Sequence, residues 1–412
     1  MKNKNINKSN AILLNLNYFF LNSIFNNYVL IVITFLFHIV IILRNNLYNS
    51  KNNLQKKSLL KNRHLFVLIL FFMLSLLLAF VSGNFNIKFG TTLLVFIQII
   101  LIFLSVKSTN NKNELFQYFC KYFIKFAFLF SLYAIILYFL GNKYQTYNTS
   151  LHSYIQSFKI FGFNFFQTSL GGDTPGTYNV GSLFSNPNTL SYTCLIAIIM
   201  SLLFLSNEKK IKVIITDLFL IVGLIISGSR LAVLLAILII PIYLLTTFIG
   251  KKAIYKVLLI TIFIFGLIAL VYNLNYILTN VNFNGRLELW KTGISNIHFL
   301  GGGLNSDNLL IQEKLHSNIS MHNSYISFAL NFGILPLIIF LLYIFSTINK
   351  SVRQANGSIV SKVLIVLLIV FLIFSLSEYT FFACSSYNLV FFMILYCCND
   401  NIDKNNEDII NF

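Results

Sequence analysis

Two arginines and one histidine are the residues of this chain whose types and spacing could do chemistry. Arg230 ends the motif SGSR, Arg286 is the second residue of GRLELW, and His322 opens HNSY. A guanidinium presents fork-shaped donors that match phosphate oxygens, and a neutral imidazole can accept a proton. These residues together indicate chemistry on an anionic substrate, provided that the fold brings them to one place.

The elements that must position them are membrane spans. Hydrophobic residues make up 57% of the chain and charged residues only 10%, so a water-soluble globule of this length could not bury its apolar surface. An apolar run of about 18 or more residues is typical of a transmembrane helix. About twelve candidate runs recur along the chain: 11–26, 27–43, 64–82, 89–106, 122–140, 188–206, 211–228, 231–249, 256–274, 322–346, 363–382 and 386–398. The runs lack the alternation of barrel strands, so we predict an all-α polytopic bundle forming one membrane domain over 1–412.

The charges predict the orientation of this bundle, because Lys and Arg remain on the cytoplasmic side. Seven short segments hold 23 of the 30 Lys and Arg: 1–10, 44–63, 107–125, 207–212, 250–256, 350–362 and 399–412. Both termini are therefore expected in the cytoplasm, and two long loops, 141–187 and 275–321, are expected outside the plasma membrane. Arg230, Arg286 and His322 fall on this outward side, which indicates a lipid-linked substrate.

The net charge of +18 is mostly a consequence of this topology and also suits an anionic inner leaflet. The cations are dispersed among short loops rather than gathered in one groove, so we expect no nucleic-acid partner. The first apolar segment lacks a small-residue cleavage site, so no cleavable signal peptide is expected. Neither long outer loop contains a cysteine. The histidines of the second loop, His298 and His316, have no Cys or carboxylate at the spacing of metal ligands. We therefore expect no disulfide framework, no metal and no cofactor.

Arg230 follows Gly228 and Ser229 at the expected outward N-terminus of the 231–249 span. Its charge there adds to the positive end of the helix dipole and to unpaired backbone N–H groups, a combination that favours phosphate oxygens. The alternative is an interfacial arginine that reaches lipid headgroups without a catalytic part.

Arg286 begins a segment, 286–297, that is expected to form a short interfacial helix in the second outer loop. Apolar residues recur there at 3-4-3 spacing and share one helical face: Leu287, Trp290, Ile294 and Ile297. The single tryptophan would anchor the helix at headgroup depth and keep Arg286 near the membrane surface. A headgroup-binding helix with no role in chemistry is the alternative.

His322 lies at the expected outward N-terminus of the 322–346 span. Nearby arginines and the positive end of the helix dipole favour the neutral imidazole, which makes His322 a candidate general base. Asn323 and Tyr325 follow it directly and are candidate substrate-binding residues. An interfacial or helix-capping histidine is the alternative.

Glu378 lies near the outer end of the 363–382 span and is the only acidic residue between positions 314 and 399. A carboxylate inside a membrane is costly and usually has a partner, so one of the two arginines is expected beside it. This contact would place Glu378 in the substrate-binding site. A coupling carboxylate of a transporter is the alternative, with His38 and Asp217 as further ionisable residues within spans.

The order of five motifs resembles the O-antigen ligase and polymerase superfamily over roughly residues 180–345. The motifs are GSLFSNPNTLSY, SGSRLAVLLA, NGRLELWKTGI, GGGLNS and HNSYISFALNFGILP, beginning at residues 181, 227, 284, 301 and 322. Members of this family act on undecaprenyl-diphosphate-linked glycans at the outer face of the plasma membrane. Arg230, Arg286 and His322 match the family's two functional arginines and its functional histidine.

The resemblance implies a metal-independent glycosyltransferase without a cofactor. We favour a polymerase that joins lipid-linked repeat units into O-antigen or capsular polysaccharide, because the shared motifs are generic and polymerases are the more diverse members. A ligase that transfers the glycan to the lipid A core of lipopolysaccharide is the alternative, and a transporter of lipid-linked oligosaccharides is an alternative of another class. The expected partners are undecaprenyl-diphosphate-linked oligosaccharide, membrane lipids, a chain-length regulator and a flippase.

Overall fold

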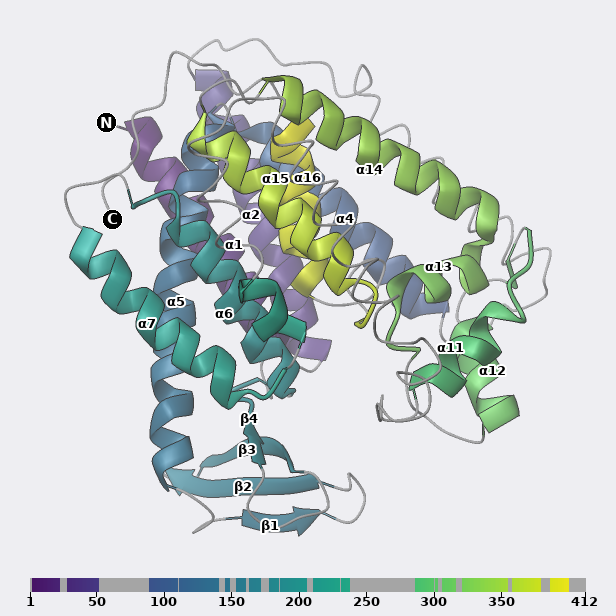
Figure 1. The fold of residues 1–412 in the computed structure, drawn as a ribbon. Helices are drawn as coiled ribbons and strands as arrows, with labels where there is room; N and C mark the ends of the chain where they lie inside the picture. Colours follow the sequence, from purple (N-terminus) through teal and green to yellow (C-terminus); the bar gives the residue numbers. More distant parts are fainter. Residues whose placement is uncertain are drawn as a thin grey trace.

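The computed structural model is a bundle of long helices with a small sheet at one end (Figure 1). It describes residues 2–22, 28–51, 89–109, 111–140, 145–148, 153–160, 163–171, 178–184, 186–205, 210–229, 231–237, 286–299, 301–302, 306–315, 321–354, 358–378 and 386–399. The predicted spans 64–82 and 256–274 lie outside these residues, as does most of 231–249.

The helices of the N-terminal half are α1 (Lys2–Asn22), α2 (Tyr28–Lys51), α4 (Phe89–Ser108), α5 (Lys112–Leu140), α6 (Pro187–Ser201) and α7 (Lys210–Ile226). Those of the C-terminal half are α11 (Arg286–Ile294), α12 (Ser306–Leu315), α13 (Ser324–Phe332), α14 (Ile334–Gln354), α15 (Ile359–Phe374) and α16 (Ser386–Asn399). In Figure 1, α1 begins and α16 ends at the same end of the bundle, and the sheet lies at the opposite end.

The hydropathy of these helices identifies a membrane protein. Three of the described helices are long and apolar enough to cross a bilayer, at Val32–Ser50, Lys112–Phe139 and Ile334–Val352. Shorter apolar helices cover Leu94–Ser108, Ile359–Phe374 and Tyr387–Cys398. The helical membrane bundle is thus confirmed, whereas about twelve spans, a single domain and cytoplasmic termini stay predictions.

Helix α1 begins nine residues before the predicted span 11–26, because its asparagines find partners on neighbouring helices. The Asn7 amide donates to Glu114 Oε2 at 2.6 Å, and the Asn10 amide donates to Asn45 Oδ1 at 2.9 Å. Such hydrogen bonds between helices stabilise polar residues in a membrane bundle. Local hydropathy alone therefore placed the start of this helix too late.

The first outer loop departs from the all-α prediction, because it contains a four-stranded antiparallel sheet. Its strands are β1 (Gln145–Asn148), β2 (Ser153–Ile160), β3 (Phe163–Gly171) and β4 (Tyr178–Val180), paired in the order β1-β2-β3-β4. Aromatic and β-branched residues are frequent in β2 and β3, and these types favour strands. The short β4 leads directly into the bundle, where Ser182 Oγ donates to the Phe130 carbonyl at 2.7 Å.

The predicted span 322–346 is not one helix but two, α13 and α14, which meet at Gly333. The φ angle of Gly333 is 100°, a value outside the right-handed helical region. The glycine loop packs into this break, because a Cβ on Gly301 would lie 2.5 Å from the Gly333 nitrogen. His322 therefore precedes the short helix α13, and only α14 has the length of a span.

Candidate active site

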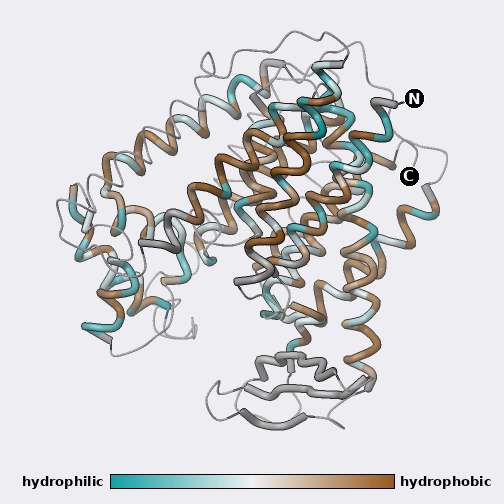
Figure 2. Tube along the Cα trace, turned by 180° about the vertical axis from the view of Figure 1, so that it is seen from behind, coloured by the Kyte–Doolittle hydropathy of each residue, from teal (hydrophilic) through white to brown (hydrophobic). Residues whose placement is uncertain are grey.

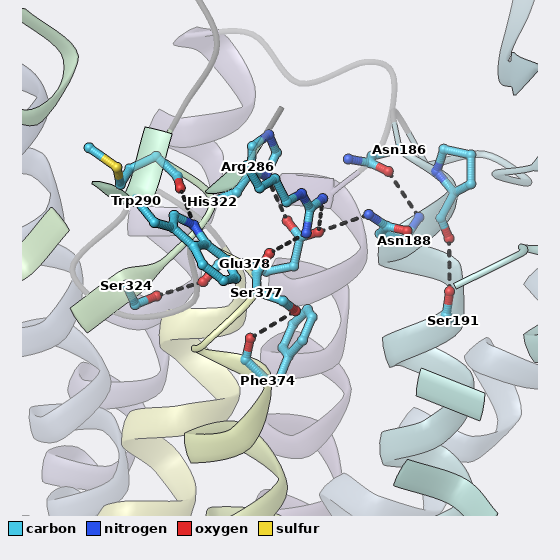
Figure 3. Close-up of polar contacts among 12 residues, drawn as sticks. Asn186, Asn188, Ser191, Arg286, Trp290, His322, Ser324, Phe374, Ser377 and Glu378 are labelled. Atoms are coloured by element: carbon cyan, nitrogen blue, oxygen red, sulfur yellow. Dashed lines mark hydrogen bonds and ion pairs between the residues drawn. The ribbon is translucent and has the colours of Figure 1, made fainter. Parts of the chain in front are cut away.

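A turn at the end of α15 is the centre of the candidate site (Figure 3). The turn 375–378 continues the helix with four backbone hydrogen bonds, which include those from Ser375 N to Phe371 O at 2.9 Å and from Glu378 N to Phe374 O at 3.1 Å. It presents the Glu378 carboxylate, whose side chain is 13% exposed, and several carbonyl groups toward α6, α11 and α13. A largely buried carboxylate requires partners, and it has three.

Arg286 is the first of these partners and is also the first residue of α11. Its Nη2 lies 3.1 Å from Glu378 Oε1, and its Nη1 donates to the Ser377 carbonyl at 2.8 Å. The arginine that pairs with Glu378 is therefore Arg286. Its side chain is 21% exposed, so part of it remains accessible.

His322 is the second partner and contacts the other carboxylate oxygen. Its Nδ1 lies 3.4 Å from Glu378 Oε2, and its side chain is 24% exposed. When Nδ1 carries the proton, Nε2 presents its lone pair and can accept a proton. The backbone of His322 has a φ of 49°, an unusual conformation for a residue other than glycine. Such conformations persist where the surrounding structure fixes them.

The surroundings that fix His322 are the first residues of α13. Asn323 caps this helix, because its Oδ1 accepts from the backbone nitrogens of Tyr325 at 3.0 Å and Ile326 at 3.1 Å. Its amide also donates to Leu376 O at 3.0 Å. Ser324 adds two more bonds to the turn, from its nitrogen to Ser375 O at 2.9 Å and from its Oγ to Glu378 O at 2.8 Å.

The candidate substrate-binding residues Asn323 and Tyr325 use their polar atoms inside the protein. The Tyr325 hydroxyl donates to the Leu372 carbonyl at 2.6 Å, and Asn323 is engaged as described above. These contacts position the α13 N-terminus against α15. Binding of substrate by either residue stays a prediction.

The third partner of Glu378 is Asn188, to which the sequence analysis assigned no role. Its amide donates to Glu378 Oε1 at 2.8 Å. Asn188 lies in the first turn of α6, where Asn186 is the N-cap and accepts from the Asn188 backbone nitrogen at 2.9 Å. Figure 3 shows Asn188 reaching the carboxylate from the side opposite to His322. The feature of the sequence that could have drawn attention to Asn188 is an Asn-Pro-Asn sequence at the start of a helix, within the motif GSLFSNPNTLSY.

Arg230 lies outside the described residues, but its neighbours show how the preceding turn is held. Ser227 Oγ and Ser191 Oγ of α6 lie 2.7 Å apart. Gly228 has a φ of 73°, and a Cβ there would collide with the Asn179 side chain. Helical structure resumes at 231–237, with Val233 N donating to Ser229 O at 3.1 Å. The turn 227–229, which precedes Arg230 in the sequence, is thus tied to α6, the same helix that supplies Asn188.

The short helix predicted at 286–297 is α11, which ends at Ile294, and the anchoring of its tryptophan at headgroup depth stays a prediction. Trp290 Nε1 donates to the Met321 carbonyl at 3.1 Å, next to His322. The indole packs on a small core of Leu289, Ile311, Met321, Ile326 and Leu330. Trp290 therefore holds α11 against α13, so that Arg286 and His322 are carried by one packed unit.

Helix α12 is fixed to α13 by a second polar cluster away from Glu378. Asp307 is 2% exposed and accepts a short hydrogen bond from Ser327 Oγ. Ser306 Oγ and Gly302 N both donate to Leu330 O at 2.8 Å. Burial raises the pKa of the Asp307 carboxyl, although hydrogen bonds from Ser327 and neighbouring groups oppose this shift.

Within the described ranges, no three His, Cys, Asp or Glu side chains converge as metal ligands. The four described cysteines, Cys120, Cys194, Cys397 and Cys398, are buried and free. Independence from metal therefore stays a prediction, to be tested by chelation.

The fold and the site define an integral membrane protein with a basic, carboxylate-supported site at the end of its helix bundle. Residues 215–341 match the family model described as O-antigen ligase. The match supports, over these residues, the resemblance of the motifs to the O-antigen ligase and polymerase superfamily. No curated protein matches the chain.

The family consists of glycosyltransferase-like enzymes that act on polysaccharide, and it implies a lipid-linked polysaccharide substrate in the membrane. The matched segment includes Arg230, Arg286 and His322. Glu378 and Asn188 lie beyond it, one on each side. Asn188 of α6 lies outside the matched segment and Arg286 of α11 lies inside it, and both contact Glu378 Oε1.

Proposed function

We propose that this protein is a polymerase that joins undecaprenyl-diphosphate-linked oligosaccharide units into O-antigen or capsular polysaccharide at the outer face of the plasma membrane. The observation that carries the proposal is the contact of Arg286 and His322 with one carboxylate, Glu378. A phosphate-binding cation and a proton acceptor are the two groups that this transfer requires.

The donor diphosphate would bind at the exposed side of Arg286, together with Arg230. A guanidinium has five N–H donors, and two of those of Arg286 are used by Ser377 and Glu378, which leaves three. Negative charge develops on the diphosphate as its bond to the sugar breaks. Fixed guanidinium donors stabilise that charge without reorganising during the reaction.

The acceptor hydroxyl would lie beside His322 Nε2. As the hydroxyl oxygen attacks the anomeric carbon of the growing chain, its proton passes to the imidazole and the carbon–oxygen bond to the diphosphate breaks with inversion. The products are a longer glycan on the incoming carrier and free undecaprenyl diphosphate. The imidazolium then releases its proton to solvent or to the diphosphate, and no metal takes part.

Glu378 would act on the substrate through its two partners rather than by direct contact, because a carboxylate repels phosphate. Accepting from Nδ1–H fixes the tautomer in which Nε2 is the base, and pairing with Nη2 orients the guanidinium. The Asn188 amide fixes the same carboxylate oxygen that Arg286 uses. Glu378 is therefore proposed as a positioning residue of the binding site.

The ligase is the second candidate, because the matched family model carries that description. The departing diphosphate is common to both reactions, so the same arginines and histidine serve both, and only the acceptor differs. A deletion strain distinguishes them on one gel of envelope glycans. Bands of at most one repeat per acceptor support the polymerase, whereas carrier-linked ladders with a bare acceptor would assign the ligase. A chain-length regulator and a flippase would be partners of the polymerase.

A further inference from the structure

Three large apolar side chains are exposed at the end of α11, shortly after it and in the first turn of α14. Ile294 ends α11 with 61% of its surface exposed, Phe299 follows with 63%, and Leu335 in the first turn of α14 has 39%. Exposed apolar side chains that gather in one area indicate an interaction surface. We call Ile294, Phe299 and Leu335 the outer apolar patch.

Hydrogen bonds hold the patch at the beginning of α14. Ile334 N donates to His298 O at 3.3 Å, and Gly301 N donates to the same carbonyl at 3.4 Å. His298 and Gly301 are therefore fixed at the start of the candidate span Ile334–Val352. The position of Phe299 follows from that of α14 in the bilayer.

The patch continues an apolar stripe along α14. The exposed members of the stripe are Leu335, Ile338, Ile339, Leu342 and Phe345, which recur at helical spacing. Figure 2 shows hydrophobic residues along much of this helix and polar residues near its far end. Such a face on a membrane-spanning helix contacts lipid, and the outer apolar patch extends that face onto the second outer loop.

Of the charged residues Glu288 and Lys291 of α11, Glu288 points away from this lipid face and Lys291 borders it. Glu288 and Lys291 are exposed, and Leu289 and Gly293 are buried against α13. At 100° per residue, Glu288 lies almost opposite Gly293, whereas Ile294 lies on the flank between Trp290 and Lys291. The helix thus has a buried side, a solvated side and an apolar flank, as in helices that lie in a membrane interface.

We propose that the outer apolar patch inserts into the hydrocarbon edge of the outer leaflet and fixes the depth of α11 in the membrane. The partner is the acyl chains of membrane lipids. Arg286 begins the same helix, eight residues before Ile294, so a helix that lies along the interface would keep Arg286 near headgroup depth as well. The inference concerns lipid contact and stands independently of the proposed reaction.

Tryptophan fluorescence tests the insertion, because the chain has a single tryptophan. The probe is the double variant Trp290→Phe/Phe299→Trp in vesicles of phosphatidylethanolamine and phosphatidylglycerol with brominated acyl chains. The matched control is Trp290→Phe/Glu288→Trp, whose probe lies on the solvated side of the same helix. We expect brominated lipid to remove most of the emission at position 299 and little at position 288.

Equal, weak quenching at both positions would overturn the proposal. A blue-shifted emission at position 299 without quenching would also overturn it, because it would place the side chain against protein. If the Trp290→Phe background does not fold, Phe299→Trp and Glu288→Trp are compared with Trp290 retained. The added quenching over the unmodified protein is then the measured quantity, with the same two outcomes.

Discussion

Arg286 and Glu378 form an ion pair at 3.1 Å although 92 positions separate them in the sequence. The pair joins the first residue of α11, in the predicted second outer loop, to the turn at the end of α15. Arg286 also donates a hydrogen bond to the neighbouring Ser377 carbonyl, so two bonds join its guanidinium to this turn. The outer loop is thereby fixed to the bundle at the point where His322 and Asn188 also meet the carboxylate.

Replacing the proposed base should remove most of the activity. Positioned general bases typically contribute 10²–10⁴-fold in rate, so His322→Ala should lower polymer formation by about that factor while membrane insertion is kept. The measurement is the rate of chain growth by purified protein in vesicles. A rate within a few-fold of the unmodified protein would remove His322 from the mechanism.

The planar geometry of the Arg286 guanidinium should contribute to activity in addition to its positive charge. Arg286→Lys keeps a cation but cannot bridge Ser377 O and Glu378 while still presenting donors to a diphosphate, so we expect a loss of about 10²-fold, close to that of Arg286→Ala. Lys291→Ala removes an exposed cation from the same helix and serves as the control, with activity kept. Equal effects at both positions would indicate a general role of positive charge, against a specific site.

Asn188 should affect activity through the carboxylate it holds. Asn188→Ala removes one hydrogen bond to a charged group, and we expect about a tenfold slower reaction, equivalent to ~1.4 kcal/mol. Asn188→Asp places a second carboxylate beside Glu378 Oε1 and should be worse. An Asn188→Asp variant as active as Asn188→Ala would show that this contact does not orient Arg286 and His322.

The buried carboxylate of Asp307 should make stability fall as pH rises. Burial raises its pKa in the folded protein, so the unfolded chain loses its proton first, at about pH 4. The contribution of Asp307 to folding stability is then lost as pH rises from that value through the raised pKa. Above the raised pKa this contribution is constant. Asp307→Asn should flatten this dependence and unfold at a higher temperature than the unmodified protein at neutral pH.

Thermal unfolding in detergent across pH 4–8 measures the Asp307 effect. Ser306→Ala alters the same cluster without changing a titrating group and should shift the curve by a constant amount. Parallel curves for the unmodified protein and Asp307→Asn would contradict the prediction.

The sequence predicted the residues of the site that carry charge. Arg286 and His322 stood out because cations are rare on the outward side, and Glu378 because an acid inside an apolar run requires a partner. The structure brings these three residues together. Arg230 was predicted by the same reasoning, and its place in the site stays a prediction because it lies outside the described residues.

Asn188 and the break at Gly333 could not be predicted in this way. An asparagine carries no charge and is common in this chain, so the Asn-Pro-Asn sequence at the start of α6 did not by itself indicate a bond to a residue 190 positions away. The break at Gly333 depends on the close approach of Gly301, which hydropathy cannot detect. The sheet was missed because its strands lie in a loop where aromatic residues also fit a membrane interface.

The reaction proposed for this protein is the joining of lipid-linked glycans to one another. The most direct measurement supplies the purified protein in vesicles with one defined undecaprenyl-diphosphate-linked oligosaccharide and resolves the products by length, with and without EDTA. We predict a ladder of lipid-linked chains that forms without lipid A core, persists in EDTA, and disappears in Arg230→Ala, Arg286→Ala and His322→Ala. Products that form only when lipid A core is added, or movement of the unchanged oligosaccharide across the bilayer without new bonds, would contradict the claim.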